Sequence, residues 1–553
     1  MCAGSVWHGR EKNISADAIM LTAAQGGERG TTMKPSRHTS SVWMKWSDLP
    51  VRTPLDEDIK TDVCVVGAGI AGLSAAYMLA QAGKSVVVLD DGPIGGGETN
   101  RTTAHLASAI DDRYFNIERW HGQRGAQLAA ESHARAISVI EHIITREGID
   151  CDFSRLDGYL FAPPGVEMKD LEKEYDAARR AGLGGLELTH HSPLAQVSTG
   201  PALRFPMQGQ LHPLKYLFAL AELVERDGGQ IFTDTRVIDV DGVDSPTVLT
   251  STGPVVRAEA VIVAANVPFI NRYAMHTKQA AYRTYVIAAT IPARTVPLAL
   301  FWDILDPYHY VRLGVNGGGG GKDLLIVGGE DHKTGQANDG NARWEQLEIW
   351  ACDLFPMIDE ICDRWSGQII EPIDGLAYIG LNPTDRGPVY IATGDSGMGM
   401  THGTIAGMIL RDLILGRSNP WHDLYRPSRR TLHAAGEFIR ENLNVANRYA
   451  DWLRKPSGSP EHIRRSCGGV SGRGRDKTAV YVDSEGNCHK LSATCPHLGC
   501  VLSWNPSESS WDCPCHGSRF DTDGEILNGP ANRAMSKARG RKEPPSGKDK
   551  EAA

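Results

Sequence analysis

The sequence predicts a chain of three parts: an α/β domain with a parallel sheet, a β-rich domain interleaved with it, and a small all-β domain. Residues 61–92 alternate strand, helix and strand patterns, as in a βαβ unit. Segments between about 155 and 380 are rich in β-branched and aromatic residues. After residue 461, short strand patterns alternate with turn residues, among which cysteines and histidines gather. A chain of 553 residues can hold two or three such domains.

The βαβ unit carries a dinucleotide-binding fingerprint. A β-branched run leads into G-A-G-I-A-G at 67–72, a helix pattern follows, and a second strand pattern ends at Asp90. The glycines permit a tight turn, a close approach of a pyrophosphate and close helix packing, while the acid binds a ribose hydroxyl. The helix N-terminus would face the phosphates. The residues concerned are Gly67, Gly69, Gly72 and Asp90. This pattern predicts a Rossmann-like domain that binds FAD or NAD.

Further segments resemble the glycine/D-amino-acid oxidase (DAO) family of flavoproteins. Residues 95–108, G-G-G-E-T-N-R-T-T-A-H-L-A-S, resemble the family's loop at the pyrophosphate and flavin. Residues 261–266 and 389–400 resemble the strand that returns to the dinucleotide and the late turn that meets the flavin ring. The resemblance spans about 60–417 and implies FAD; a glycine-rich surface loop is the alternative for 95–108. It implies these further FAD-side residues: Glu98, Thr99, Arg101, Thr102, Thr103, Gly394, Gly397 and Gly399.

The same resemblance implies an FAD-dependent oxidoreductase domain over 46–419. Its antiparallel substrate subdomain, around 155–215 and 275–380, would hold an amine or amino-acid substrate against the flavin. Candidate catalytic residues are Tyr285, Tyr308, His309 and His402, with ordinary core packing as the alternative for each. Sarcosine-type relatives carry a substrate-gripping lysine near position 401, where this chain has threonine. The substrate therefore lacks a carboxylate, or its carboxylate is held by another group such as Arg283 or Arg312.

The sequence pattern changes after residue 419, where the resemblance to the flavoprotein family ends. Residues 420–460 predict a helical connector that ends in the boundary sequence P-S-G-S-P. A small β-rich domain over 461–535 follows, with C-x-H at 495–497 and C-x-x-H at 513–516. Two cysteines and two histidines could hold zinc, but zinc fingers take both cysteines from one element. Here each loop offers one cysteine and one histidine, which favours a [2Fe–2S] cluster with two thiolates and two imidazoles.

These loops resemble those of Rieske proteins, together with Gly517-Ser518 and the later Gly529-Pro530-Ala531. The resemblance implies four metal ligands: Cys495, His497, Cys513 and His516. It also implies a disulfide between Cys500 and Cys515, with two free packed cysteines as the alternative. Rieske oxygenases lack that cysteine pair, so the pair argues against an oxygenase.

Net charge and hydropathy argue against nucleic-acid binding and against a membrane span. The net charge of −9 gives no basic field for nucleic acid, and no apolar run reaches the length of a membrane span. The N-terminus lacks a secretory signal pattern, so we expect a cytoplasmic protein. Residues 1–45 are expected to be a disordered leader or, over 1–32, an overextended start. Residues 536–553 are expected to be a disordered tail.

The two resemblances imply one function. An amine or amino-acid-like substrate would pass a hydride to FAD, and electrons would leave singly through the cluster to an external acceptor. Only one complete fingerprint is present, which disfavours a nicotinamide-linked reductase. Two alternatives stay open: an external donor could feed electrons through the cluster to the flavin, or the protein could be a non-catalytic redox or interaction module.

Overall fold

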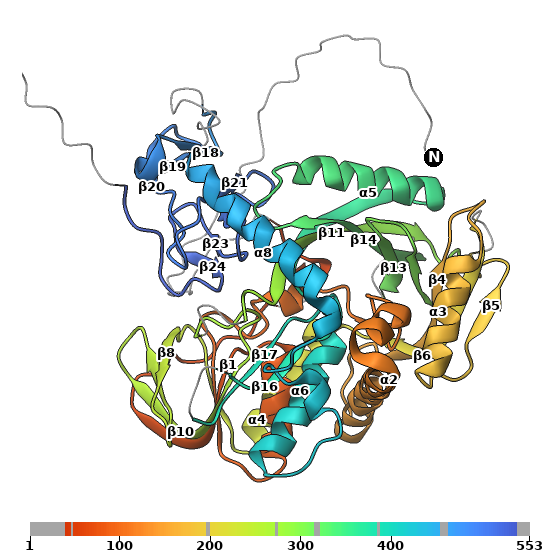
Figure 1. Ribbon diagram of the computed structural model, residues 1–553, viewed down its shortest axis with the longest axis horizontal. Helices are drawn as coiled ribbons and strands as arrows, with labels where there is room; N and C mark the ends of the chain where they lie inside the picture. Colours follow the sequence, from red (N-terminus) through yellow and green to blue (C-terminus); the bar gives the residue numbers. More distant parts are fainter. Residues whose placement is uncertain are drawn as a thin grey trace, which may run out of the picture.

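Three domains and a helical connector make up the computed structural model of the chain (Figure 1). We call them the α/β domain, the sheet domain and the C-terminal domain. The described residues are 39–45, 48–194, 199–270, 275–314, 321–383, 387–453 and 463–538. Residues 1–38 of the expected leader and 539–553 of the expected tail lie outside them.

The α/β domain is built on an eight-stranded sheet, in which β16, β17, β10, β1, β2 and β7 are neighbours in that order. β1 pairs in parallel with both β2 and β10, so its apolar residues are buried on both faces. Helices α1, α4 and α6 pack together against the sheet. The strands are β1 (Ile59–Val66), β2 (Val86–Leu89), β7 (Gln230–Phe232), β8 (Val237–Asp241), β9 (Thr247–Thr250), β10 (Val255–Val263), β16 (Tyr378–Leu381) and β17 (Val389–Thr393). The helices are α1 (Ile70–Ala80), α4 (Pro213–Arg226) and α6 (Gly399–Ile414).

The sheet domain has nine strands, with β15, β11, β14, β13, β12, β4, β6 and β3 in order and β5 beside β6. All pairs are antiparallel except β12 with β4, so the sheet departs at one pair from the expected pattern. The strands are β3 (His105–Leu106), β4 (Ser154–Phe161), β5 (Glu187–Thr189), β6 (Ala202–Gln210), β11 (Gln279–Pro292), β12 (Leu300–Asp303), β13 (His309–Gly314), β14 (Lys322–Lys333) and β15 (Glu360–Pro372). Its helices are α2 (Tyr114–Glu147), α3 (Lys169–Arg180) and α5 (Gly340–Leu354), with the short η2 (Glu98–Arg101) ahead of them. α5 covers one face of β11 and β14, which leaves the opposite face for the α/β domain (Figure 1).

The connector runs across the molecule to the C-terminal domain, and its long helix α8 crosses the front in Figure 1. α8 has no fully buried residue, and polar contacts hold it in place. Tyr449 Oη donates to Leu498 O (3.0 Å), and Asn442 Nδ2 donates to Thr277 O (3.0 Å). The connector elements are α7 (His422–Tyr425), η3 (Leu432–Ala434), α8 (Ala435–Tyr449) and η4 (Ala450–Trp452).

The C-terminal domain consists of a three-stranded and a four-stranded antiparallel sheet. Trp511 and Phe520 are fully buried between them, together with the cysteines of the two predicted loops. The strands are β18 (Cys467–Ser471), β19 (Thr478–Val482), β20 (Cys488–Ser492), β21 (Ser503–Asn505), β22 (Ser510–Asp512), β23 (Arg519–Phe520) and β24 (Ile526–Asn528), with η6 (Gly474–Asp476) between β18 and β19. Lys537 still pairs with Leu491, so the ordered domain extends two residues past the expected boundary at 535.

The N-terminal end of the described chain corrects the expected leader boundary at residue 45. Residues Val42–Lys45 form the short helix η1, in which Val42 and Trp43 are buried. The indole of Trp43 donates to Thr102 O (2.7 Å) and packs edge-on against His212. Burial of a large aromatic residue with a satisfied N–H offsets the entropy of ordering this short segment. Within the described residues, no helix combines the length and apolarity needed to cross a membrane.

Candidate functional site

A cavity of about 1,380 Å³ lies where the three domains meet. It is bounded by the glycine turn after β1, the loop before η2 and the turn before α6. Trp302 and Tyr310 of the sheet domain line it, as do residues 526–529 of the C-terminal domain. This volume exceeds that of ordinary small-ligand pockets, about 300–1,000 Å³, and suits a dinucleotide together with a substrate.

The glycine turn has the geometry that the fingerprint predicts. Gly67 has φ +112°, and a Cβ there would lie 2.5 Å from Ala264 O. A Cβ on Gly72 would overlap the carbonyl oxygen of Gly67, so this glycine lets α1 pack on the turn. Gly69 lines the cavity at the start of α1, where free N–H groups and the helix dipole favour phosphate. Asp90 also lines the cavity and accepts hydrogen bonds from Ala68 N (2.6 Å) and Gly92 N (2.9 Å).

The loop around η2 follows the cavity wall as the DAO resemblance implies. Thr99 Oγ1 accepts from Ile70 N (3.1 Å), which ties the loop to the first turn of α1. Glu98 accepts from Gln368 N (2.7 Å) and from Asn528 Nδ2 (2.9 Å), so one carboxylate joins the sheet domain to the C-terminal domain. All five expected residues line the cavity: Glu98, Thr99, Arg101, Thr102 and Thr103.

The turn before α6 brings a second helix N-terminus to the cavity. Gly394 (φ +75°) and Gly397 (φ +69°) adopt left-handed conformations, and Gly399 begins α6. All three line the cavity. A positive helix end at this place would stabilise an anionic reduced flavin. Two helix N-termini that follow glycine turns at one cavity fit FAD.

The structure separates the four candidate catalytic residues into two pairs. Tyr308 and His402 line the cavity, whereas Tyr285 and His309 do not. Tyr285 and His309 project to the opposite face of the sheet, where Tyr285 packs edge-on against Trp344 of α5. His309 Nδ1 lies 2.8 Å from Asp303 Oδ2, and its ring stacks on Trp350. The residues at the intervening positions, Thr284 and Tyr310, line the cavity instead and escaped the sequence analysis.

Neither arginine suggested for a substrate carboxylate reaches the cavity. Arg312 is buried and donates to the carbonyl oxygens of Thr103 (2.8 Å) and Ala104 (2.9 Å). Arg283 is buried in the interface with the C-terminal domain, 3.3 Å from Glu508 Oε1. Both expectations are corrected, because these guanidinium groups are used in packing the domains.

The two loops of the C-terminal domain bring the predicted metal ligands together. The imidazole rings of His497 and His516 lie edge-on with centroids 5.1 Å apart. Cys495 and Cys513 share a hydrogen bond, which lowers the pKa of Cys495 and raises that of Cys513. Backbone N–H groups of each loop point at its own thiol, as expected around sulfur that carries negative charge.

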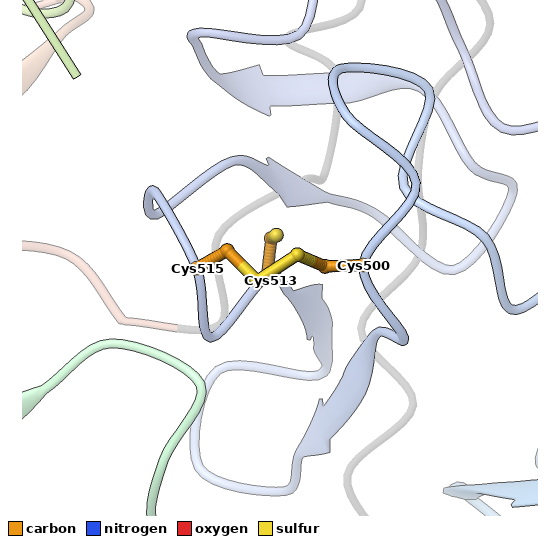
Figure 2. A group of neighbouring side chains, drawn as sticks. All are labelled: Cys500, Cys513 and Cys515. Atoms are coloured by element: carbon orange, nitrogen blue, oxygen red, sulfur yellow. A yellow bond between two sulfur atoms is a disulfide. The ribbon is translucent and has the colours of Figure 1, made fainter. Parts of the chain in front are cut away.

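Cys500 and Cys515 are bonded to each other and clamp the two loops (Figure 2). Their sulfurs and Cys513 Sγ lie within 4.8 Å of one another. This trio is not a ligand set, because two of its three sulfurs are used in the disulfide. The disulfide agrees with the Rieske resemblance and excludes the alternative of two free cysteines.

The remaining donors fit a [2Fe–2S] cluster. His516 Nδ1 is buried and has no hydrogen-bond partner among the described residues. Burial and the neighbouring His497 lower the pKa of His516 to about 3, so its ring is neutral. Two imidazoles and two cysteine thiols, one of each on either loop, are the donor set of such a cluster.

The cluster-binding loop docks directly on the sheet domain beside the cavity. A Cβ on Gly517 (φ +78°) would overlap the Ala281 side chain, so only glycine permits this approach. Gln368 lines the cavity, and its Nε2 donates to Gly517 O (2.8 Å). The ring of His276 lies 4.8 Å from that of His497 and 5.7 Å from that of His516. The histidine edge of the site therefore faces the sheet domain.

A buried ionic network holds this interface. Glu508, 1% exposed, lies 3.7 Å from Arg101 of η2 and 3.3 Å from Arg283 of β11. It also accepts hydrogen bonds from Ser366 and from Thr39 (2.6 Å). Arg101, expected at the flavin, thus lines the cavity and also binds the C-terminal domain. Sequence reasoning missed Glu508, since its partners are far away in the chain.

Comparison with known proteins agrees with this architecture. The family model described as FAD dependent oxidoreductase matches residues 62–413, and the Rieske [2Fe-2S] domain model matches 464–539. YhfW of Bacillus subtilis (strain 168), named as a Rieske 2Fe-2S iron-sulfur protein, is 31% identical over 90% of this chain and 96% of its own. Gamma-glutamylputrescine oxidoreductase of Escherichia coli (strain K12) is 27% identical over 69% of this chain and 90% of its own. Glycine oxidase from Geobacillus kaustophilus has a similar fold (TM-score 0.55, 21% identity), covering 67% of this chain and 99% of that one.

Proposed function

Because this chain belongs to the FAD-dependent oxidoreductase (DAO) family and carries a C-terminal Rieske [2Fe-2S] domain, we propose that it oxidises an amine and passes the electrons to an external acceptor. FAD accepts a hydride from a substrate, and a Rieske cluster carries one electron at a time. Similarity to gamma-glutamylputrescine oxidoreductase supports the choice of an amine.

One observation carries the proposal: the cluster-binding loop and the flavin cavity share Gln368. Its backbone N–H donates to Glu98 (2.7 Å), which lines the cavity, and its side chain donates to Gly517 O (2.8 Å). Gly517 is the residue after the ligand His516. A short hydrogen-bonded route thus joins the two sites, which supports electron transfer within one chain.

The residues of this chain have separate roles in the proposal. The glycine turn and the N-termini of α1 and α6 bind FAD and stabilise negative charge. Tyr308 and His402 line the cavity, and the proposal assigns them to its substrate end. Cys495, His497, Cys513 and His516 hold the cluster, and the Cys500–Cys515 disulfide keeps their loops together.

Anaerobic titration of the holoprotein with a panel of primary and secondary amines tests the substrate class. We expect at least one amine to bleach the flavin absorbance. If dithionite bleaches the flavin and no amine does, the substrate assignment is wrong. Cluster reduction by an external donor, followed by flavin bleaching, would instead support a reductase.

A further inference from the structure

The substrate end of the cavity presents a carboxylate. Asp111 lines the cavity and is half-buried. A Cβ on Gly397 would lie 2.6 Å from Asp111 Oδ2, which places this oxygen at the turn expected to meet the flavin ring. Tyr308 Oη donates to the same oxygen (2.7 Å) and fixes the carboxylate toward the cavity. Asp395, a second carboxylate, lines the cavity at the same turn and accepts a hydrogen bond from Ile370 N (3.2 Å).

Aromatic rings line the cavity beside Asp111. Trp302, Tyr308 and Tyr310 all line it, and the rings of the two tyrosines lie 5.6 Å apart. Tyr310 is held by a 2.7 Å hydrogen bond between its hydroxyl and that of Thr284. Aromatic faces next to a carboxylate form a site that attracts an organic cation through both charge and ring electrons.

No cation among the described lining residues is free to bind a substrate carboxylate. The lining arginines are Arg101, which lies 3.7 Å from Glu508, and Arg236, which pairs with Asp91 (2.8 Å). Arg113 lies behind Asp111, does not line the cavity, and donates to the carbonyl oxygens of Asp111 and Asp303 (both 3.1 Å).

The two lining histidines are also uncharged. Burial, helped by Arg312, lowers the pKa of His105 to about 3, and burial lowers that of His402 to about 4. Burial also raises the pKa of Asp111, and it raises that of Asp395 to about 6. A cation bound beside these carboxylates would favour their charged forms.

We infer, on the basis of the proposed function, that Asp111 binds the ammonium group of the substrate. The enzyme's substrates are then amines that bear no carboxylate on the carbon next to nitrogen. An α-carboxylate would lie near Asp111 and Asp395 with no free cation to pair with, so amino acids are excluded by charge. Asp111 is thus a specificity-determining residue of the cavity.

A matched pair of ligands tests binding separately from turnover. tert-Butylamine and 2-aminoisobutyrate have similar shapes, but only the second carries a carboxylate. Neither has a hydrogen on the carbon next to nitrogen, so neither can reduce the flavin. Dissociation constants are measured on the oxidised holoprotein from the perturbation of flavin absorbance. We expect tert-butylamine to bind at least about tenfold more tightly than 2-aminoisobutyrate.

The variant Asp111→Asn keeps the size of the side chain and removes its charge. We expect it to weaken tert-butylamine binding by at least about tenfold, while Asp176→Asn, exposed on α3, leaves the constant unchanged. Equal or tighter binding of 2-aminoisobutyrate by the unmodified protein overturns the inference, and this result does not depend on whether the variant folds. The inference is also overturned if Asp111→Asn retains FAD and cluster absorbance and binds tert-butylamine as tightly as the unmodified protein does. Failure of every amine to bleach the flavin, with these binding results intact, would reject the proposed reaction alone.

Discussion

Replacing Glu508 with glutamine is expected to lower the free energy of unfolding by about 3 kcal/mol, because an unpaired buried charge costs roughly 3–5 kcal/mol. Glu508 is 1% exposed and lies against the buried guanidinium groups of Arg101 and Arg283. Without its charge, these arginines stay protonated in the interface with too little compensation. Denaturant unfolding followed by flavin fluorescence and by the visible absorbance of the cluster measures the change. Glu525→Gln, exposed in the same domain, is the control and should change the free energy by less than about 0.5 kcal/mol.

The charge of Glu508 should also make the free energy of unfolding depend on pH. Burial alone would raise the pKa of Glu508, but Arg101, Arg283 and Arg519 outweigh it and lower the pKa from 4.5 to about 2. A carboxylate whose pKa falls on folding contributes stability that is complete above its unfolded pKa and is lost as pH falls toward its folded pKa. The contribution, on the order of 3 kcal/mol, should therefore disappear between about pH 5 and pH 2. Glu508→Gln should flatten this part of the stability curve. If the curves of unfolding free energy against pH run parallel for the unmodified protein and for Glu508→Gln, the stability of the interface does not depend on this charge.

Replacing Cys513 with serine is expected to abolish the cluster, since a serine hydroxyl does not supply the thiolate that iron requires. The protein should keep its flavin absorbance and lose both the visible cluster bands and the EPR signal of the reduced state. Iron content per chain, measured on the purified variant, checks the loss directly.

The disulfide cysteines provide the matched control for this variant. The double change Cys500→Ser and Cys515→Ser should leave the cluster in place and lower the free energy of unfolding by about 3 kcal/mol, the value for a cross-link that closes a loop of about 15 residues. Loss of iron from the double variant equal to that from Cys513→Ser would contradict the division into ligands and clamp.

The sequence predicted the parts of the molecule whose signals are local. The glycine turn at 67–72 and each cysteine–histidine loop lie within one short segment, because backbone conformation and metal geometry restrict the residues allowed there. The order of the domains follows from the positions of these segments along the chain. The cavity wall was harder to predict. Tyr308, His309 and Tyr310 are consecutive, and only a strict two-residue alternation separates the cavity face from the α5 face.

No short sequence pattern predicts the contacts between the domains. Glu508 and Arg283 are 225 residues apart, and nothing in either segment identifies its partner. For the same reason, the sequence does not reveal the hydrogen bond from Trp43 to Thr102, and the expected leader includes residues 42–45. Long-range polar contacts of this kind are determined by the docked surfaces, which a single sequence does not reveal.

The most direct test of the account is a rapid freeze-quench EPR experiment on the oxidised, anaerobic holoprotein mixed with an amine that bleaches its flavin. The account predicts that the EPR signal of a reduced Rieske cluster appears after the flavin bleaches and before any external acceptor is added. Complete flavin bleaching with a cluster that stays oxidised and EPR-silent would contradict electron transfer between the two sites of this chain.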